Sequence, residues 1–196
     1  MAAGDAPGAL GARAGAGERT FVAALLAVFA ALAILSMRVK NPTFDETAHL
    51  AAGVSYVQKR DFRMNPEHPV LPKLLAGASA GLAGAKHSWD TEAWRDAEQW
   101  DFAREVLYGP GADWRRILFA GRLPMVAIGV ALGFATWAWT RAMAGPTGAA
   151  VALALYAFCP NLLAHARLVT TDVPLTLAVV GASACLWAAW RGGRIG

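Results

Sequence analysis

Long apolar runs alternate with polar segments along this chain. The first run, Phe21–Met37, has no charged residue, and after a long polar interval three more follow, at Leu123–Thr140, Thr147–Leu163 and Val173–Trp190. The hydrocarbon core of a bilayer is about 30 Å thick, which about 20 helical residues cross. The pattern therefore predicts an all-α polytopic membrane protein with about four transmembrane helices.

The polar interval after the first run holds shorter amphipathic patterns. The apolar segment Val70–Ala85 contains Pro72 and Lys73 and is rich in Gly and Ala, which favours a helix at the membrane interface over a fifth span. In "HSWDTEAWRDAEQWDFAREVLYGPG", rings recur near a helical turn with charges between them, which predicts one amphipathic helix ending at Gly109-Pro110. We therefore expect a large first outer loop containing juxtamembrane helices.

Composition agrees with a membrane class. Of the 196 residues 56% are hydrophobic and 16% are charged, and the two cysteines, Cys159 and Cys185, fall inside predicted spans, where they pack as small hydrophobes. The net charge of +4 comes from Lys and Arg scattered at span ends rather than in a stripe, so no nucleic-acid partner is expected.

The basic residues at span ends predict the topology. A single orientation places five of them on the cytoplasmic side: Arg13, Arg19, Arg141, Arg191 and Arg194. The same orientation places other basic residues on the outer side, against the positive-inside preference: Arg38, Lys40, Arg115, Arg116 and Arg122. Because a long loop translocates largely regardless of its charge, we expect the interval 39–121 outside a plasma (inner) membrane.

The first span could also be a signal peptide, since Arg13 and Arg19 precede it. No A-x-A cleavage site precedes the next charges in "SMRVKNP", so an uncleaved anchor is favoured. The expected organisation is then a flexible cytoplasmic tail (1–19), a span (20–38), an extracytoplasmic loop (39–121), spans at 122–142 and 147–164, an outer turn (165–172), a span (173–190) and a cytoplasmic end (191–196). We expect the chain to be the N-terminal part of a longer one.

The stretch "FDETAHLAAG" sets Asp45 and Glu46 behind the first span. Thr43 and Glu46 have the spacing of a capping box, and both acids fall in a first helical turn, where the macrodipole favours anions. A structural role would explain them fully, with His49 as an interfacial side chain. Catalytic carboxylates at the membrane surface are the alternative.

Two further stretches carry ionisable groups on the same predicted face. In "NPEHPVLPKLL" prolines stiffen the backbone around Glu67 and His68, with Lys73 one turn into the next helix. In "AHARLVTTDVP" a short interval between two spans holds His165, Arg167 and Asp172. Ionisable groups at a span are costly and indicate a functional site, although Thr171 or Asp172 could instead cap the fourth span.

These groups could converge on one cavity at the membrane boundary, which suits a substrate that is half lipid and half polar. A carboxylate there can deprotonate an acceptor hydroxyl, and a cation can stabilise a phosphate leaving group.

The stretch "FDETAHLAAGVSYVQKRDFRMNPEHPVLPKLLAG" resembles the first outer loop of the GT-C-type membrane glycosyltransferases, which include protein O-mannosyltransferases and the aminoarabinose transferases of lipid A. It has the Asp-Glu pair, a His, a Gly and a Tyr, then a His-Pro segment with Lys in which Val70 replaces the usual second Pro. "GRLPMVAIGVALG" and "FCPNLLAHARLVTTDVPLTLA" resemble later family segments. The resemblance extends from Thr43 to Ala178.

The resemblance implies transfer of a sugar from a polyprenyl-phosphate carrier to a lipid, protein or glycan acceptor, outside the cytoplasm and with inversion. It implies Asp45 as general base, Glu46 in support and Asp172 as the second acid. Candidates for carrier or acceptor contacts are His68, Lys73, Arg167, Glu67 and His165. Some relatives hold a divalent metal, for which Glu46 and His49 at i, i+3 are candidates; the cofactor is otherwise unknown.

Two other classes stay open. A transporter would use Asp172, Arg167 and His165 as an ion or substrate site, but its charges are expected at mid-span depth. A membrane scaffold would need none of these groups for chemistry.

Overall fold

The computed structural model describes residues 14–192, which form helices without any strand. The helices are α1 (Ala16–Met37), α2 (Phe44–Lys59), α3 (Val70–Leu82), α4 (Glu92–Arg95), α5 (Gln99–Tyr108), α6 (Trp114–Ala157), α7 (Pro160–His165) and α8 (Asp172–Arg191). The predicted all-α polytopic fold is confirmed. The sequence segments 1–13 and 193–196, which include most of the predicted tail and end, lie outside the described residues.

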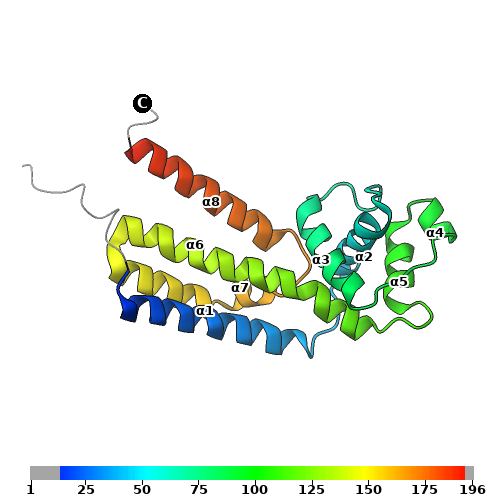
Figure 1. Ribbon diagram of the computed structural model, residues 1–196, viewed down its shortest axis with the longest axis horizontal. Helices are drawn as coiled ribbons and strands as arrows, with labels where there is room; N and C mark the ends of the chain where they lie inside the picture. Colours follow the sequence, from blue (N-terminus) through cyan, green and yellow to red (C-terminus); the bar gives the residue numbers. More distant parts are fainter. Residues whose placement is uncertain (1–13, 193–196) are drawn as a thin grey trace, which may run out of the picture.

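Three helices are long and apolar enough to cross a membrane: α1, α6 and α8. At about 1.5 Å per residue, the 22 residues of α1 and the 20 of α8 each match a core of about 30 Å. The 44-residue α6 contains a reversal at Gly145, whose φ of 72° and ψ of −176° only glycine adopts readily, and Pro146 follows it. In Figure 1 the chain turns back there, so α6 contains the second predicted span and the first part of the third, which continues after a break into α7.

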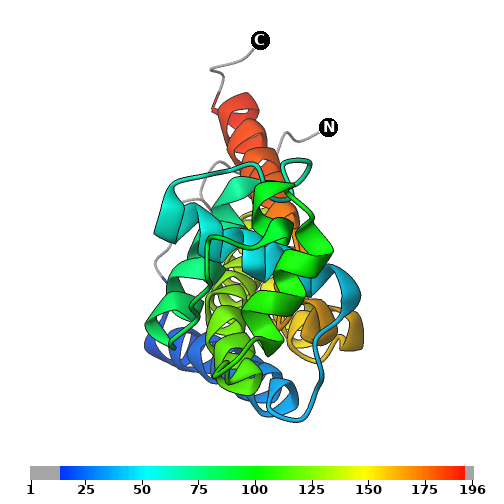
Figure 2. The same ribbon diagram turned by 90° about the vertical axis from the view of Figure 1, so that its right-hand side faces the viewer.

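The helices α2 to α5 form a cap at one end of this bundle (Figure 1), and Figure 2 shows them in front of the long helices when viewed from that end. The cap shares an apolar core with the start of α6, in which Leu50 and Phe102 of the cap and Ile117 of α6 are fully or almost fully buried. The helix α2 packs on α3 and α5, and α3 packs on α6, which fixes the cap to the bundle.

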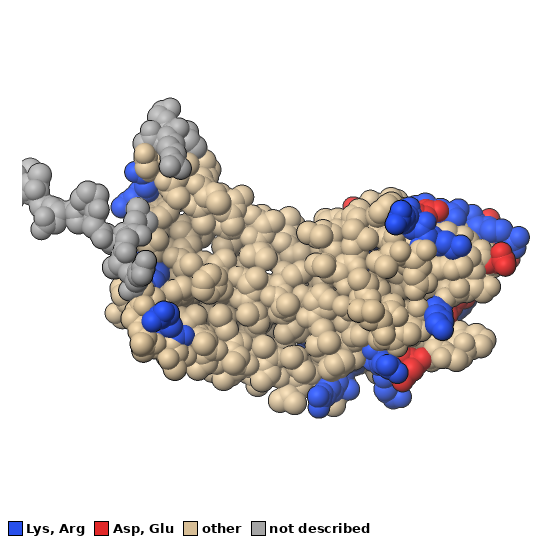
Figure 3. All heavy atoms as spheres, in the orientation of Figure 1, with Lys and Arg blue, Asp and Glu red and all other residues tan. Residues whose placement is uncertain are grey.

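Charged side chains lie mainly at the two ends of the molecule. Figure 3 shows a band without Lys, Arg, Asp or Glu across the middle of one face, with charges to either side. The helix α8 is the most exposed part of the bundle, since only 6% of its apolar window is buried. An apolar band of this kind matches the hydrocarbon core of a bilayer.

Several predicted boundaries differ from the structure. The segment expected to form one amphipathic helix is divided into α4 and α5, because Ala97 has a φ of 59° and interrupts the helix; its predicted end at Gly109 is confirmed. The helix α1 begins at Ala16, before the predicted span start at residue 20, and the helix α6 begins at Trp114, within the segment 39–121. Here Asp113 caps α6 by accepting from the Arg116 amide at 3.2 Å.

Candidate active site at the membrane boundary

A buried ion pair between Glu46 and Arg122 connects the cap with the bundle. The guanidinium donates from Nε to Oε1 at 2.8 Å and from Nη2 to Oε2 at 2.6 Å, and the side chains are 0% and 1% exposed. Arg122 also donates to the carbonyls of Met37, Lys40 and Asn41 at 3.0–3.2 Å. A bidentate pair with its remaining donors satisfied is the arrangement in which a buried charge is tolerated.

The sequence around Glu46 explains its position. The predicted capping box of Thr43 and Glu46 is present, and Glu46 Oε2 accepts from the Thr43 amide at 3.2 Å. Its other oxygen accepts from the amide of Val169, at 3.0 Å, in the segment between α7 and α8. Glu46 therefore connects the start of α2 with Arg122 of α6 and with Val169. Both of its oxygens accept hydrogen bonds that hold these parts together.

His49 lies one turn further along α2 and faces the same segment. Its Nδ1 is 3.0 Å from the Val169 carbonyl, which can only accept, so Nδ1 carries the proton. The ring packs edge-on against His68 with centroids 4.7 Å apart. Burial is the largest cause that lowers the pKa of His49, the positive charge of His68 and Lys73 lowers it further, and Asp45 acts in the opposite direction. Three predicted site residues, His68, Lys73 and Asp45, therefore interact electrostatically with the His49 ring.

Asp45 is exposed in the first turn of α2, directly before the locked Glu46. Within residues 14–192 its carboxylate has no hydrogen-bond or ion-pair partner. Asp45 and His49 are four residues apart, so they share a helix face. The start of α2 therefore fixes where Asp45 lies, and no described side chain occupies its carboxylate.

Among the ionisable groups before α8, only Arg167 has an electrostatic interaction with the Glu46–Arg122 pair in the described part of the chain. Arg167 is half-buried, and burial together with the charge of Arg122 lowers its pKa, whereas Glu46 raises it. His165 Nδ1 lies 3.4 Å from Asp172 Oδ2, with both side chains at least half exposed. Asp172 is the first residue of α8, and no side chain caps this helix. The predicted cap at Thr171 or Asp172 is therefore not formed by a side-chain hydrogen bond.

Lys73 and Glu67 lie in a second polar cluster. Lys73 is 1% exposed, and its ammonium donates to the backbone carbonyl and the side-chain oxygen of Asn65. Burial lowers the pKa of Lys73 to about 8. Glu67 accepts from the Asn65 amide group at 2.9 Å and is exposed. The stiff loop therefore presents Glu67 to solvent, while the Lys73 ammonium holds the loop from inside.

Comparison with known proteins adds to this geometry. Residues 116–196 match the family described as "Dolichyl-phosphate-mannose-protein mannosyltransferase". This match indicates a glycosyltransferase. It supports the predicted resemblance to the GT-C type and the general use of a polyprenyl-phosphate-linked sugar. A search of curated proteins and a search of solved structures each gave no match.

The matched segment contains Arg122, Arg167 and Asp172, but it begins after Asp45 and His49. The Glu46–Arg122 pair and the Glu46–Val169 hydrogen bond join the two parts. The residues predicted from the first loop are therefore attached directly to the segment that carries the family match.

Arg122 is the residue that sequence reasoning missed. An Arg just before an apolar run is usually a topology determinant, and no spacing relates it to Glu46, which is 76 residues earlier. Only its place in "GRLPMV", at the start of a segment resembling the family, distinguished it.

A divalent metal does not fit Glu46 and His49 as they are arranged. The carboxylate of Glu46 already accepts from Arg122 and from two backbone amides, so neither of its oxygens is open to a metal. Among the residues that the structure describes, no group of three or more His, Cys, Asp or Glu side chains could hold a metal.

An apolar groove of about 460 Å³ opens beside these groups, between α3, α6 and α8. Its lining includes Pro69 and Thr171, which adjoin His68 and Asp172 in sequence, and Ile128 of α6. Apart from a small polar fraction the wall is hydrocarbon. A lipid chain is the kind of ligand that such a wall fits.

Proposed function

We propose that this chain carries the catalytic base of an inverting glycosyltransferase, which moves a sugar from a polyprenyl-phosphate carrier to an acceptor hydroxyl outside the cytoplasm. The observation that carries the proposal is the free carboxylate of Asp45, held at a helix start by the buried Glu46–Arg122 pair. The residues that hold it there include part of the segment that matches the mannosyltransferase family.

The reaction is a single displacement. The acceptor O–H gives its proton to Asp45 while its oxygen attacks the anomeric carbon, and the bond from that carbon to the carrier phosphate breaks. The phosphate leaves with the electron pair. Arg167 and His68 are the candidates that stabilise its charge, and Asp172 and His165 are candidates for binding the acceptor or sugar.

The groove between α3, α6 and α8 is suited to the carrier. Its hydrocarbon wall would hold the polyprenyl chain, while the phosphate and sugar reach the polar groups beside Pro69 and Thr171. The acceptor could be a lipid, protein or glycan, and the membrane is proposed to be the plasma (inner) membrane.

The charged residues of the long helices favour an enzyme over a transporter. Glu18 and Arg141 pair at 2.6 Å near the start of α1 and the Gly145 reversal, and Asp172 begins α8. These ionisable groups therefore lie at helix ends rather than at mid-span depth, where a transport pathway needs them.

The substitution Asp45→Asn tests the base. Full-length protein in membranes is supplied with polyprenyl-phosphate sugars, mannose first, and transfer to acceptor is measured. Because general-base catalysis contributes roughly 10²–10⁴-fold, we expect at least a 100-fold loss of turnover with the protein still folded. The matched control is Asp90→Asn, which changes an exposed carboxylate in the same cap. Turnover by Asp45→Asn equal to that of the control would refute the proposal.

A further inference from the structure

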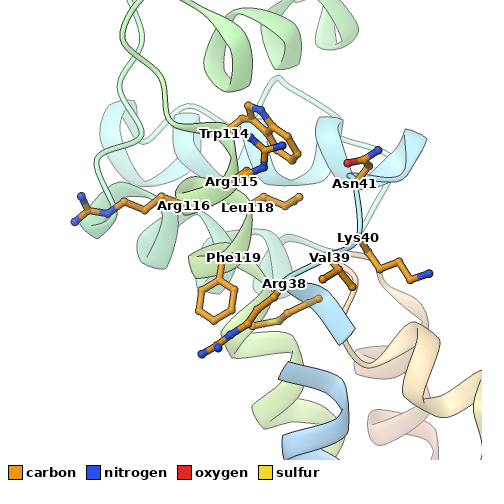
Figure 4. A pocket seen from close by; sticks show the side chains of 10 residues that line it. Arg38, Val39, Lys40, Asn41, Trp114, Arg115, Arg116, Leu118 and Phe119 are labelled. Atoms are coloured by element: carbon orange, nitrogen blue, oxygen red, sulfur yellow. The ribbon is translucent and has the colours of Figure 1, made fainter. Parts of the chain in front are cut away.

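A second pocket, of about 520 Å³, lies between the end of α1 and the start of α6. We call it the basic pocket. Its lining includes Arg38, Lys40, Arg115 and Arg116, together with Trp114 and Phe119. Figure 4 shows these side chains arriving from both elements, with Lys40 and Arg116 extending to opposite sides.

The four cations of the basic pocket are exposed and lack carboxylate partners. In the described part of the chain, each of the ion pairs involves other residues. Two of the cations instead lie against rings, with Arg38 5.9 Å from the Phe119 centroid and Arg115 4.6 Å from that of Trp114. Positive charge gathered in excess of nearby negative charge, with Asp113 at the start of α6 held by the Arg116 amide, favours an anionic ligand.

The position of the basic pocket indicates an amphiphile. The helix α1 ends at Met37, which also lines the pocket, so the pocket lies where a membrane span meets the headgroup region. Leu118 and Phe119 add an apolar side, and a Trp at this level is typical of the membrane interface. In the orientation proposed above, these cations also run against the positive-inside preference, which leaves them without a role in topology.

Arg122 separates the basic pocket from the proposed transfer site. Its guanidinium donates to carbonyls of Met37, Lys40 and Asn41, which line the pocket, and to Glu46, which contacts Val169 on the other side. The polyprenyl carrier is assigned to the groove beside α8. The lipid with access to the basic pocket is therefore one of the surrounding bilayer.

We propose that the basic pocket binds the phosphate headgroup of an anionic bilayer phospholipid. The positive field of its four cations would attract the phosphate, and the acyl chains would run along the apolar sides of α1 and α6. Because the segment from Arg38 to Asn41 supplies carbonyls to Arg122, a bound lipid also stabilises the Glu46–Arg122 pair, which positions Asp45.

Lipid binding to the purified full-length protein tests this proposal without any sugar transfer. Retention of phosphatidylglycerol and of phosphatidylcholine is compared by native mass spectrometry, and each lipid's effect on the melting temperature is measured. Phosphatidylglycerol is expected to bind more tightly and to raise the melting temperature. The variant R38Q/K40Q/R115Q/R116Q should lose this preference, by about fivefold per cation removed.

The matched control removes four exposed charges elsewhere in the cap, in R60Q/K86Q/R95Q/R104Q, and should keep the preference. If the quadruple pocket variant does not fold, the pairs R38Q/K40Q and R115Q/R116Q replace it, each with an expected loss of about 25-fold. Equal losses in pocket and control variants would overturn the proposal. So would displacement of phosphatidylglycerol by equimolar polyprenyl phosphate, or equal binding of inorganic phosphate.

Discussion

At the scale of single residues, the proposed chemistry depends on two neighbouring acids that have different roles. Asp45 and Glu46 are adjacent acids, but Glu46 is buried with Arg122 and Asp45 is exposed. The difference follows from helix geometry, since successive residues point about 100° apart around the axis. One acid can therefore be structural while the other stays free to react.

Breaking the buried pair should be far more costly than breaking an exposed one. Arg122→Met leaves Glu46 charged and unpaired in the interior, so we expect a loss of about 3–5 kcal/mol in unfolding free energy. Arg104→Met is the control, because Arg104 and Asp101 pair at 2.7 Å with side chains 72% and 57% exposed; its cost should be below about 1 kcal/mol. Denaturant unfolding in detergent measures both.

The double variant Glu46→Gln/Arg122→Met should recover part of that loss, because it removes the unpaired charge. If Arg122→Met unfolds at the same denaturant concentration as Arg104→Met, the Glu46–Arg122 pair does not hold the cap to the bundle.

At the scale of elements, α2 and α3 cross at a point that admits no side chain. A Cβ on Gly53 would overlap the Lys73 carbonyl, and one on Gly77 would overlap the backbone of Gly53. Both helices also carry predicted site residues, with Asp45 and His49 on α2 and His68 just before α3. The close crossing is what brings His49 and His68 into ring contact.

Gly53→Ala should therefore separate α2 from α3. We expect a destabilisation of several kcal/mol, about the scale of severe core overpacking, and loss of sugar transfer. Gly81→Ala is the matched control on α3, since its nearest neighbour is Gln58 Nε2 at 3.7 Å. That change should be neutral or should stabilise the helix by up to about 1 kcal/mol. Melting temperature and turnover report both, and a Gly53→Ala protein as stable as Gly81→Ala would contradict the close crossing.

At the scale of the whole molecule, the cap and the Gly145 reversal lie at opposite ends of the long helices (Figure 1). An apolar band separates these ends in Figure 3. One end therefore faces each side of the membrane, and the proposed function requires the cap to be outside the cytoplasm.

Cysteine labelling tests this orientation. In a background with Cys159 and Cys185 replaced by Ala, Ser88→Cys places a thiol on the exposed surface of the cap and Thr147→Cys places one beside the reversal. An impermeant maleimide added to intact cells should label position 88 and leave 147 unlabelled until the membrane is opened. The reverse pattern would place the proposed site in the cytoplasm.

Apolar run length and local chemistry determined much of this protein from sequence alone. Spans of bilayer length and the Thr43–Glu46 capping box depend on neighbours in the chain, so their patterns are visible there. The division of the segment before Gly109 into α4 and α5 was not predicted, because a backbone break at Ala97 has no Gly or Pro to mark it.

Only the tertiary structure decided which charges are buried, which are paired and which are free. The Glu46–Arg122 contact spans 76 positions and joins the first turn of α2 to α6, so no local pattern encodes it. Lys73 looks like a surface ammonium in sequence, but α3 packs against α2 and α6 and turns it inward. The sequence identifies the ionisable groups. The packing of the helices then determines how deeply each group is buried and which charges lie near it, and so which role it can have.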